Sequence, residues 1–364
     1  MKAARSIGAV TLAIVVVAAL GLWLLRGPLS LALMRRIAER AMASDPIAAL
    51  PDGLHVGLCG SGSPLPDATR AGPCEVVVAG RRLFVIDTGQ GSVRNLSLMN
   101  LPPARAEAVF LTHYHSDHIA DLGEMMLQHW AGGAATRPIP IYGPTGLGQV
   151  VAGFEAAYQL DKGYRIAHHG PKVVPPSGFG GDPHEFEAPH GGPDVVLIDE
   201  PDLKVTAFPV DHEPVEPAVG YRFDYKGRRV VISGDTRLSP RVEAEARNAD
   251  VLVHEALSPG VLDIQRQAAL AAGRTNIAAI FHDIVAYHTT PEQAAGLAQR
   301  AHVRFLLLDH IVPALPLRSL EGPFLGRARA IFHGPLRLGH DGDFVSLPAG
   351  STRIERSNRL NHWL

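Results

Sequence analysis

Four potential metal ligands lie within the six residues His113–His118, whose sequence is HYHSDH. The apolar run Ala108–Leu111 comes directly before them and predicts a buried strand. Neutral imidazole and carboxylate are ligands that suit Zn²⁺, Fe or Mn. Side chains two residues apart on an extended segment point the same way, so His113 and His115 are predicted to share one ion. The chain then turns, which directs Asp117 and His118 toward a second ion. The alternative is a polar loop that is rich in histidine by coincidence, but burying these groups without a metal would be costly.

Three more candidate ligands follow apolar runs further along the chain. His212 follows Phe208–Val210, Asp235 follows Val230–Ile232, and His310 follows Phe305–Leu308. A single histidine after an apolar run is more often a structural residue than a ligand, so each of these positions alone is weak evidence.

Taken together, these motifs resemble those of the metallo-β-lactamase superfamily, in the order that the family has them. The resemblance covers roughly residues 55 to 345 and implies an α/β fold, a four-layer αββα sandwich. It also implies two divalent metal ions, with Zn²⁺ as the first expectation and Mn²⁺ or Fe²⁺ as alternatives. The implied ligands are His113, His115 and His212 for one ion, Asp117, His118 and His310 for the other, and Asp235 between them. Both aspartates are expected to orient the attacking hydroxide as well.

Finer features resemble the ribonuclease Z-like branch, which also holds arylsulfatase-type enzymes and other phosphodiesterases. The stretches that carry this resemblance are Gly60–Pro64, His212–Arg222, Ser233–Thr236, His254–Ala256 and His288–Thr290. In ribonuclease Z, the histidine that matches His288 assists departure of the leaving oxygen. A polar residue in front of a helix is the alternative for His288. His254 and Glu255 are expected to support the site, and Asp87 matches an aspartate that holds the ligand loop by hydrogen bonds.

Several elements that should position these residues are readable. Strands are predicted at Leu54–Cys59, Cys74–Val78 and Leu83–Asp87, and helices at Ile119–Trp130 and Thr290–Ala301. Thr290 is a plausible N-cap for the second helix, with Pro291 in its first turn. Residues 170–193 hold six Gly and six Pro, which predicts a long surface loop. Its position before His212 favours a loop that lines the pocket over a solvated connector.

The amino terminus differs from the rest of the chain. Ser6–Leu25 has no charge and is almost wholly apolar, about the length that crosses a ~30 Å hydrocarbon core. We therefore expect a transmembrane anchor at 1–26, an amphipathic juxtamembrane segment at 27–50, a hydrolase domain at 51–345 and a C-terminal tail at 346–364. A cleaved signal peptide or a buried helix are the alternatives. The expected location is the inner membrane of a bacterial-type cell, with the catalytic domain in the periplasm. Flanking charges do not settle the orientation.

The sequence predicts the substrate and the partners less directly than the metal site. The segment between Tyr221 and Val230 has room only for a short hairpin, where the common bacterial ribonuclease Z has a long tRNA-binding arm. The formal net charge of −2 offers no long-range attraction for nucleic acid. We therefore expect hydrolysis of a small sulfate or phosphate ester and no nucleic-acid partner. The alternatives are processing of tRNA 3′ ends, lactone or β-lactam hydrolysis, and a non-enzymatic scaffold. Homodimerisation and a disulfide between Cys59 and Cys74 are both left open.

Overall fold

The computed structural model describes residues 2–360, and within its first helix the side chains of 15–17, 19–21, 23 and 25 onward. Met1 of the predicted anchor and residues 361–364 of the predicted tail lie outside the described residues. The chain forms two units, residues 1–49 and residues 50–364. The first unit contains the helix α1 (Lys2–Ala43).

The predicted single transmembrane helix is not supported. Among the described residues, no single helix is both long enough and apolar enough to cross a membrane. Val15–Gly21 and Leu25–Ala43 reach the required length and composition only as a pair, and a bend of 53° separates them.

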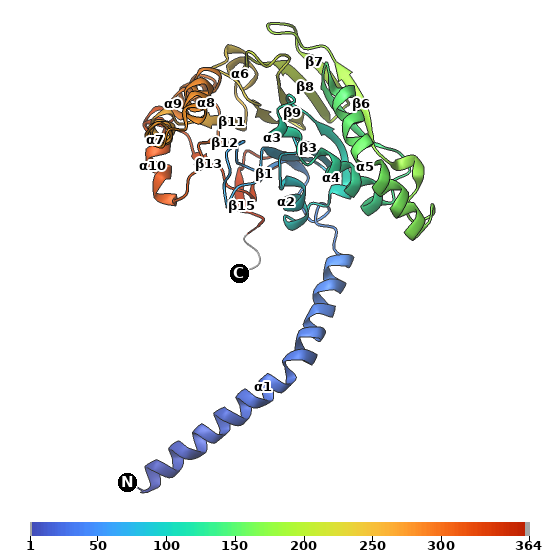
Figure 1. The fold of residues 1–364 in the computed structure, drawn as a ribbon, viewed down its shortest axis with the longest axis vertical. Helices are drawn as coiled ribbons and strands as arrows, with labels where there is room; N and C mark the ends of the chain where they lie inside the picture. Colours follow the sequence, from blue (N-terminus) through green and yellow to red (C-terminus); the bar gives the residue numbers. More distant parts are fainter. Residues whose placement is uncertain (1, 361–364) are drawn as a thin grey trace. The chain divides into compact units, whose positions relative to one another are not determined.

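The second unit is built on two β-sheets (Figure 1). Sheet A has eight strands in the order β15-β14-β1-β2-β3-β4-β5-β6. Its strands β3 to β6 run parallel, whereas β1 and β2 pair antiparallel with their neighbours. In chain order its strands are β1 (Gly53–Gly60), β2 (Cys74–Ala79), β3 (Arg82–Ile86), β4 (Ala106–Phe110), β5 (Ile139–Pro144), β6 (Gly181–Phe186), β14 (Asp343–Pro348) and β15 (Glu355–Asn358).

Sheet B has seven strands in the order β13-β12-β11-β10-β9-β8-β7. Strands β10 to β13 are parallel, which brings their carboxyl ends to one edge of the sheet. Strand β8 points the same way, because it is two antiparallel steps from β10. The strands are β7 (Val195–Asp199), β8 (Leu203–Pro209), β9 (Val219–Tyr225), β10 (Arg228–Ile232), β11 (Val251–Leu257), β12 (Leu306–Val312) and β13 (Leu336–Leu338).

Helices cover the outer faces of both sheets, which completes the four layers (Figure 1). On the side of sheet A lie α2 (Ser92–Leu98), α3 (Ser116–Ile119), α4 (Leu122–Leu127) and α5 (Leu147–His169). On the side of sheet B lie α6 (Pro240–Glu245), α7 (Pro259–Ala271), α8 (Thr275–Asp283), α9 (Pro291–Arg300), α10 (Glu321–Leu325) and α11 (Ala328–Ile331). The single-turn segments are η1 (Pro103–Arg105), η2 (Gln128–Gly132), η3 (Pro176–Gly178), η4 (Ile284–Tyr287) and η5 (Arg318–Leu320).

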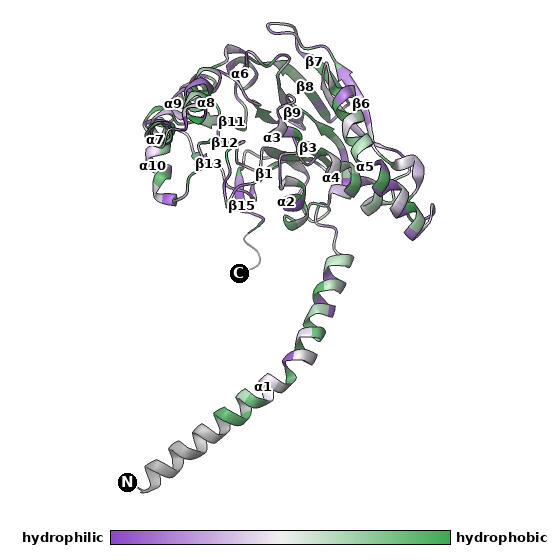
Figure 2. Ribbon diagram, viewed as in Figure 1, coloured by the Kyte–Doolittle hydropathy of each residue, from purple (hydrophilic) through white to green (hydrophobic). Residues whose placement is uncertain are grey.

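Among the described residues, two large apolar cores hold these layers together. The first lies between the sheets, where Phe84 and Phe110 of sheet A meet Phe223 of sheet B with ring centroids 5.7–5.9 Å apart. The second packs α6 and α9 on the other face of sheet B. Because both faces of the central strands β11 and β12 are covered, every residue in them is buried and each begins with three apolar residues, which appear green in Figure 2.

The helix predicted at Ile119–Trp130 is interrupted. It consists of α3, α4 and the π-helical turn η2, with a break at Ala120 and Asp121. The backbone N–H of Asp121 donates to the carbonyl of Thr88 instead of continuing a helix (2.8 Å). The Thr290 cap is confirmed, because Thr290 and Gln293 form a reciprocal capping box.

Two predicted boundaries also change. Residues 181–186 of the supposed loop form the edge strand β6, whose polar side chains are exposed and appear purple in Figure 2. Pro183 is tolerated there because an edge strand needs hydrogen-bond donors on one side only. The tail boundary at 345 falls inside β14, where buried Val345 and Leu347 keep the chain in sheet A.

Cys59 and Cys74 form a disulfide that joins neighbouring strands β1 and β2. Both residues are buried. The disulfide therefore fixes the start of the loop 61–72, which leaves β1 on the edge where the candidate ligands lie.

Candidate metal centre

The candidate ligands come from three loops and one strand at the edge where parallel strands of both sheets end. His113, His115, Asp117 and His118 follow β4, His212 follows β8, and Asp235 follows β10. His310 lies within β12, at a positive φ of 41°. This left-handed conformation is uncommon for a residue other than glycine, and here it occurs at a candidate ligand.

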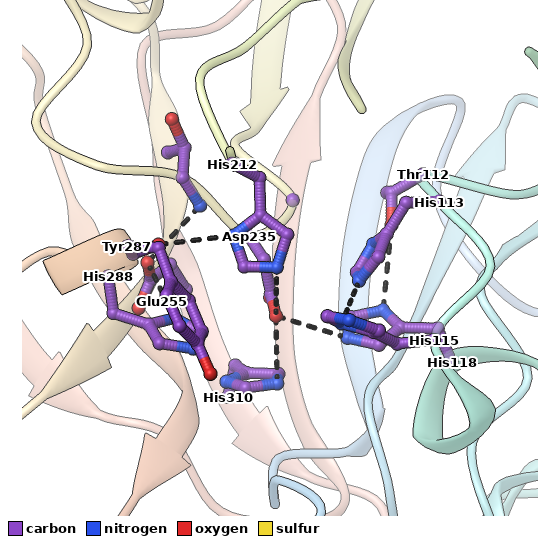
Figure 3. Close-up of polar contacts among 12 residues, drawn as sticks. Thr112, His113, His115, His118, His212, Asp235, Glu255, Tyr287, His288 and His310 are labelled. Atoms are coloured by element: carbon purple, nitrogen blue, oxygen red, sulfur yellow. Dashed lines mark hydrogen bonds and ion pairs between the residues drawn. The ribbon is translucent and has the colours of Figure 1, made fainter. Parts of the chain in front are cut away.

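The structure brings these side chains into two groups that each could hold an ion, and Figure 3 labels all of them except Asp117. His113, His115, His212 and Asp235 offer ligand atoms within 4.8 Å of one another, and so do Asp117, His118 and His310. Asp235 connects the groups, because its Oδ2 lies 3.9 Å from His212 Nε2, 3.4 Å from His118 Nε2 and 3.2 Å from His310 Nε2. The seven residues predicted from the sequence therefore do converge on one centre.

The imidazole rings are oriented by contacts on their far sides. His118 Nδ1 donates to Asp87 Oδ2 (2.7 Å), and His212 Nδ1 donates to the carbonyl of Tyr287 (3.1 Å). Each contact fixes which ring nitrogen carries the proton, so that Nε2 of both rings is free to bind metal.

Asp87 holds the ligand loop as the sequence predicted. Besides His118, it accepts hydrogen bonds from the backbone N–H of Thr112 (2.8 Å) and from Thr112 Oγ1 (2.7 Å). The same hydroxyl oxygen lies 3.1 Å from His113 Nδ1. One carboxylate therefore supports ligands of both groups.

The donor set fits a pair of divalent ions. Several buried ligand atoms have no hydrogen-bond partner: Asp117 Oδ2, His118 Nε2, His212 Nε2 and His310 Nε2. Buried polar atoms normally have a hydrogen-bond partner, so unpartnered ligand atoms that converge on one point fit a metal-binding site. Imidazole and carboxylate together suit Zn²⁺, and also Mn²⁺ or Fe²⁺.

Electrostatics separates the two groups of histidines. Burial lowers the pKa of His212 to about 4 and holds the pKa of His113 well below its usual value, so both rings are neutral at pH 7. Burial also acts to lower the pKa of His310, but the carboxylates of Asp235 and Asp117 outweigh it and raise the pKa to about 9. Burial alone would raise the pKa of Asp235, but the facing His310 and His118 outweigh burial and hold this pKa well below its usual value.

His288 lies beside the two groups, at the end of η4 (Figure 3). Its Nδ1 donates to Glu255 Oε1 (3.1 Å), and this oxygen also accepts from the backbone N–H of Thr289 (2.9 Å). The ring centroid of His288 lies 5.3 Å from that of His212 and 5.4 Å from that of His310. The supporting role predicted for Glu255 thus acts on His288.

His254 does not reach the centre. Its ring is buried, and Nδ1 is 2.8 Å from the backbone carbonyl of Glu255.

Sequence reasoning missed Tyr287, whose ring centroid lies 5.3 Å from that of His212 and whose carbonyl orients that histidine. A backbone acceptor carries no side-chain signal, and only its position next to His288 pointed to it.

Fold and site together define a metal-dependent hydrolase. Residues 82–311 match the family described as "Beta-lactamase superfamily domain". A ribonuclease Z of Mycolicibacterium gilvum is 38% identical over 290 residues, 79% of this chain and 94% of that protein. A ribonuclease Z of Mycobacterium avium is 35% identical over 82% of this chain and 100% of that protein. The chain therefore belongs to the metallo-β-lactamase superfamily, in its ribonuclease Z-like branch.

Solved structures agree on the fold. The human tRNase Z, short form, superposes with a TM-score of 0.56 at 24% identity, over 81% of this chain and 100% of that chain. The metallo-beta-lactamase fold protein YhfI from Bacillus subtilis gives a TM-score of 0.58 at 21% identity, over 81% and 100%.

The expectation of no nucleic-acid partner is wrong. It rested on the low net charge and on the missing arm, whereas relatives that match about four-fifths of this chain are named ribonuclease Z. Net charge was a poor guide, because it says nothing about how charged side chains are distributed over the surface.

Proposed function

We propose that this protein is a ribonuclease Z-type endonuclease that hydrolyses a phosphodiester bond near the 3′ end of precursor tRNA. The observation that carries the proposal is the meeting of the two ligand groups at Asp235, with His288 beside them. The ribonuclease Z relatives supply the substrate class.

A pair of divalent ions, when bound, activates water at neutral pH and neutralises charge on the phosphate. His113, His115 and His212 would hold one ion, Asp117, His118 and His310 the other, with Asp235 shared. The carboxylate oxygens of Asp117 and Asp235 that remain free would orient the attacking water. Doubly protonated His288 would give its Nε2 proton to the oxygen that leaves the phosphorus, while its Nδ1–H stays bonded to Glu255 and the ring is left neutral.

A panel of three substrates tests the proposal. The metal-replete enzyme is assayed against a precursor tRNA, an aryl phosphodiester and an aryl sulfate. We expect cleavage of the precursor at a single site, with products that end in a 3′-hydroxyl. Negligible tRNA cleavage by an enzyme that turns over either small ester would refute the RNA substrate.

Hydrolysis of a small phosphate or sulfate ester at the same centre is the second candidate. The observation in its favour is the turn between β9 and β10, where only Lys226 and Gly227 separate the strands. No protruding arm is present there to hold a folded RNA. The same substrate panel separates the two candidates.

A further inference from the structure

A hollow of about 1430 Å³ lies at the ligand edge of sheet A, lined by the loop 61–72, α2, the segment that follows β12 and residues near the C-terminus. Arginines from widely separated parts of the chain line it: Arg70, Arg94, Arg318, Arg329, Arg337 and Arg356. The acidic residues of the lining are fewer: Asp67, Glu321 and Asp341. The hollow is therefore basic, although the chain as a whole is not.

The acidic residues are already engaged by neighbouring groups. Asp341 accepts hydrogen bonds from the backbone N–H groups of Ser61 (2.9 Å) and Ala71 (2.7 Å), and from Asn95 Nδ2 (2.8 Å). Glu321 lies 3.0 Å from His340 Nε2. These contacts fix the walls of the hollow and use the acceptor capacity of its carboxylates.

Two of the arginines have no partner among residues 2–360, and a third, Arg356, makes only a cation–π contact with Phe305 (5.5 Å). Arg94 on α2 and Arg318 on η5 are exposed, and within residues 2–360 neither guanidinium has a hydrogen bond or ion pair. Arg337, in contrast, pairs with Asp343, and buried Arg70 donates to Ser61 Oγ and to the carbonyl of Gly339. The free guanidiniums can bind an anion without breaking an existing contact.

The walls of the hollow connect directly to the metal centre. The backbone N–H of Ile311, next to His310, donates to the carbonyl of Ser61 (3.0 Å). On the other side, the N–H of Gly72 donates to the carbonyl of Gln90, and the N–H of Thr88 donates to the carbonyl of His118. A polyanion bound in the hollow would therefore lie at the same edge of the fold as the reacting bond.

We propose that this arginine-lined hollow binds the phosphate backbone of the RNA substrate, in place of the arm that the short β9–β10 turn lacks. The inference rests on the proposed function and names the surface that holds its substrate. Guanidinium groups make paired, charge-assisted hydrogen bonds to phosphate oxygens, which suits backbone contacts that do not depend on base sequence.

Fluorescence anisotropy of a labelled precursor tRNA tests the hollow without any turnover. The full-length protein is freed of metal with a chelator and titrated at several salt concentrations. The double variant Arg94→Glu/Arg318→Glu should weaken binding about tenfold or more and reduce the slope of log K against log salt by about 2, or about 1 per lost phosphate contact. Arg94→Gln/Arg318→Gln, which removes the charges without reversing them, should weaken binding less.

Arg137→Glu is the matched control. Arg137 is exposed and precedes β5, at the opposite edge of sheet A, and it should leave the affinity and the salt slope unchanged. Turnover of a small aryl phosphodiester should be the same in all variants once metal is restored, because the substitutions do not touch the ligands.

The outcomes are distinguishable. The role of the hollow would be refuted if the Arg94→Glu/Arg318→Glu variant bound precursor tRNA with the affinity and salt slope of the wild type. The proposed function would still stand in that case, provided that the wild type cleaves precursor tRNA. A wild-type enzyme that hydrolyses the aryl phosphodiester but neither binds nor cleaves tRNA would overturn the proposed function, and the hollow with it.

Discussion

Replacing His288 with alanine separates proton donation from metal binding. The ring lies about equally far from His212 and His310, and Glu255 holds its Nδ1, so Nε2 is the atom available to the leaving oxygen. General acid catalysis contributes about 10²–10⁴-fold to rate, or about 2.7–5.4 kcal/mol at 1.36 kcal/mol per tenfold. Cleavage of RNA releases a ribose oxygen, which needs this proton, whereas a nitrophenolate leaves without it.

We therefore expect His288→Ala to reduce kcat/KM for precursor tRNA by about 10²–10⁴-fold and to leave 4-nitrophenyl diesters nearly unaffected. The assay is a series of phosphodiesters whose leaving groups span a wide range of basicity. A plot of log kcat/KM against the pKa of the leaving group should become steeper in the variant. His168→Ala, an exposed histidine on α5, is the control that should change nothing.

Two results would refute this reasoning. An equal loss for all leaving groups would assign His288 a structural role. A fall in metal content by elemental analysis would make it a ligand instead, because a nitrogen of His288 lies within 4.8 Å of ligand atoms of Asp235 and His310.

Other predictions follow from the same structure. The purified protein should bind about two divalent ions per chain by elemental analysis, and Asp235→Ala should lower the occupancy of both, since its carboxylate lies between the groups; loss of only one ion would contradict the bridging role. Metal affinity, measured by chelator competition, should rise at least about tenfold per pH unit from pH 7 and flatten near pH 9, because the metal-free protein holds a proton on His310 up to a pKa of about 9 and binding must displace it. Because the pKa of His310 is raised in the folded state, its protonated ring stabilises the metal-free protein. This contribution is fully present below pH 6.5 and is lost as the pH rises through about 9. Chemical unfolding of the metal-free protein should therefore show that His310 contributes less to the free energy of unfolding at pH 10 than at pH 6. Cys59→Ser/Cys74→Ser should lower the free energy of unfolding by about 3 kcal/mol, the value for a loop of about 15 residues; reduced wild type should match the variant. The location outside the cytoplasm that the sequence led us to expect is untested, and it conflicts with a tRNA substrate; a reporter that is active only in the periplasm, fused after residue 364, decides between them, and its activity would count against precursor tRNA as the substrate.

The metal ligands were predictable because their signal is local. His113 and His118 fall in one short motif, and His212, Asp235 and His310 each follow an apolar run, so the sheet brings them together without further information. Asp87 was predicted from its motif for the same reason, and its three hydrogen bonds match that role.

Features that depend on long-range contacts were not predictable. Asp121 interrupts the expected helix because its N–H bonds to Thr88, which is far away in the chain. Tyr287 orients His212 through a backbone carbonyl, which any residue type could offer. The basic hollow is lined by residues that are as far apart in the sequence as Arg94 and Arg318, so no basic run in the sequence predicts it.

The short segment η4 affects both metal affinity and proton donation. Its last residue, Tyr287, orients a ligand of one ion, and the next residue, His288, is the proposed acid. A displacement of η4 would thus alter metal affinity and proton delivery at once, and by linkage metal occupancy would in turn bias the position of η4 and of α8 before it. Substitutions on α8 that never touch the centre should therefore shift both properties together, as a correlated pair across a series of variants.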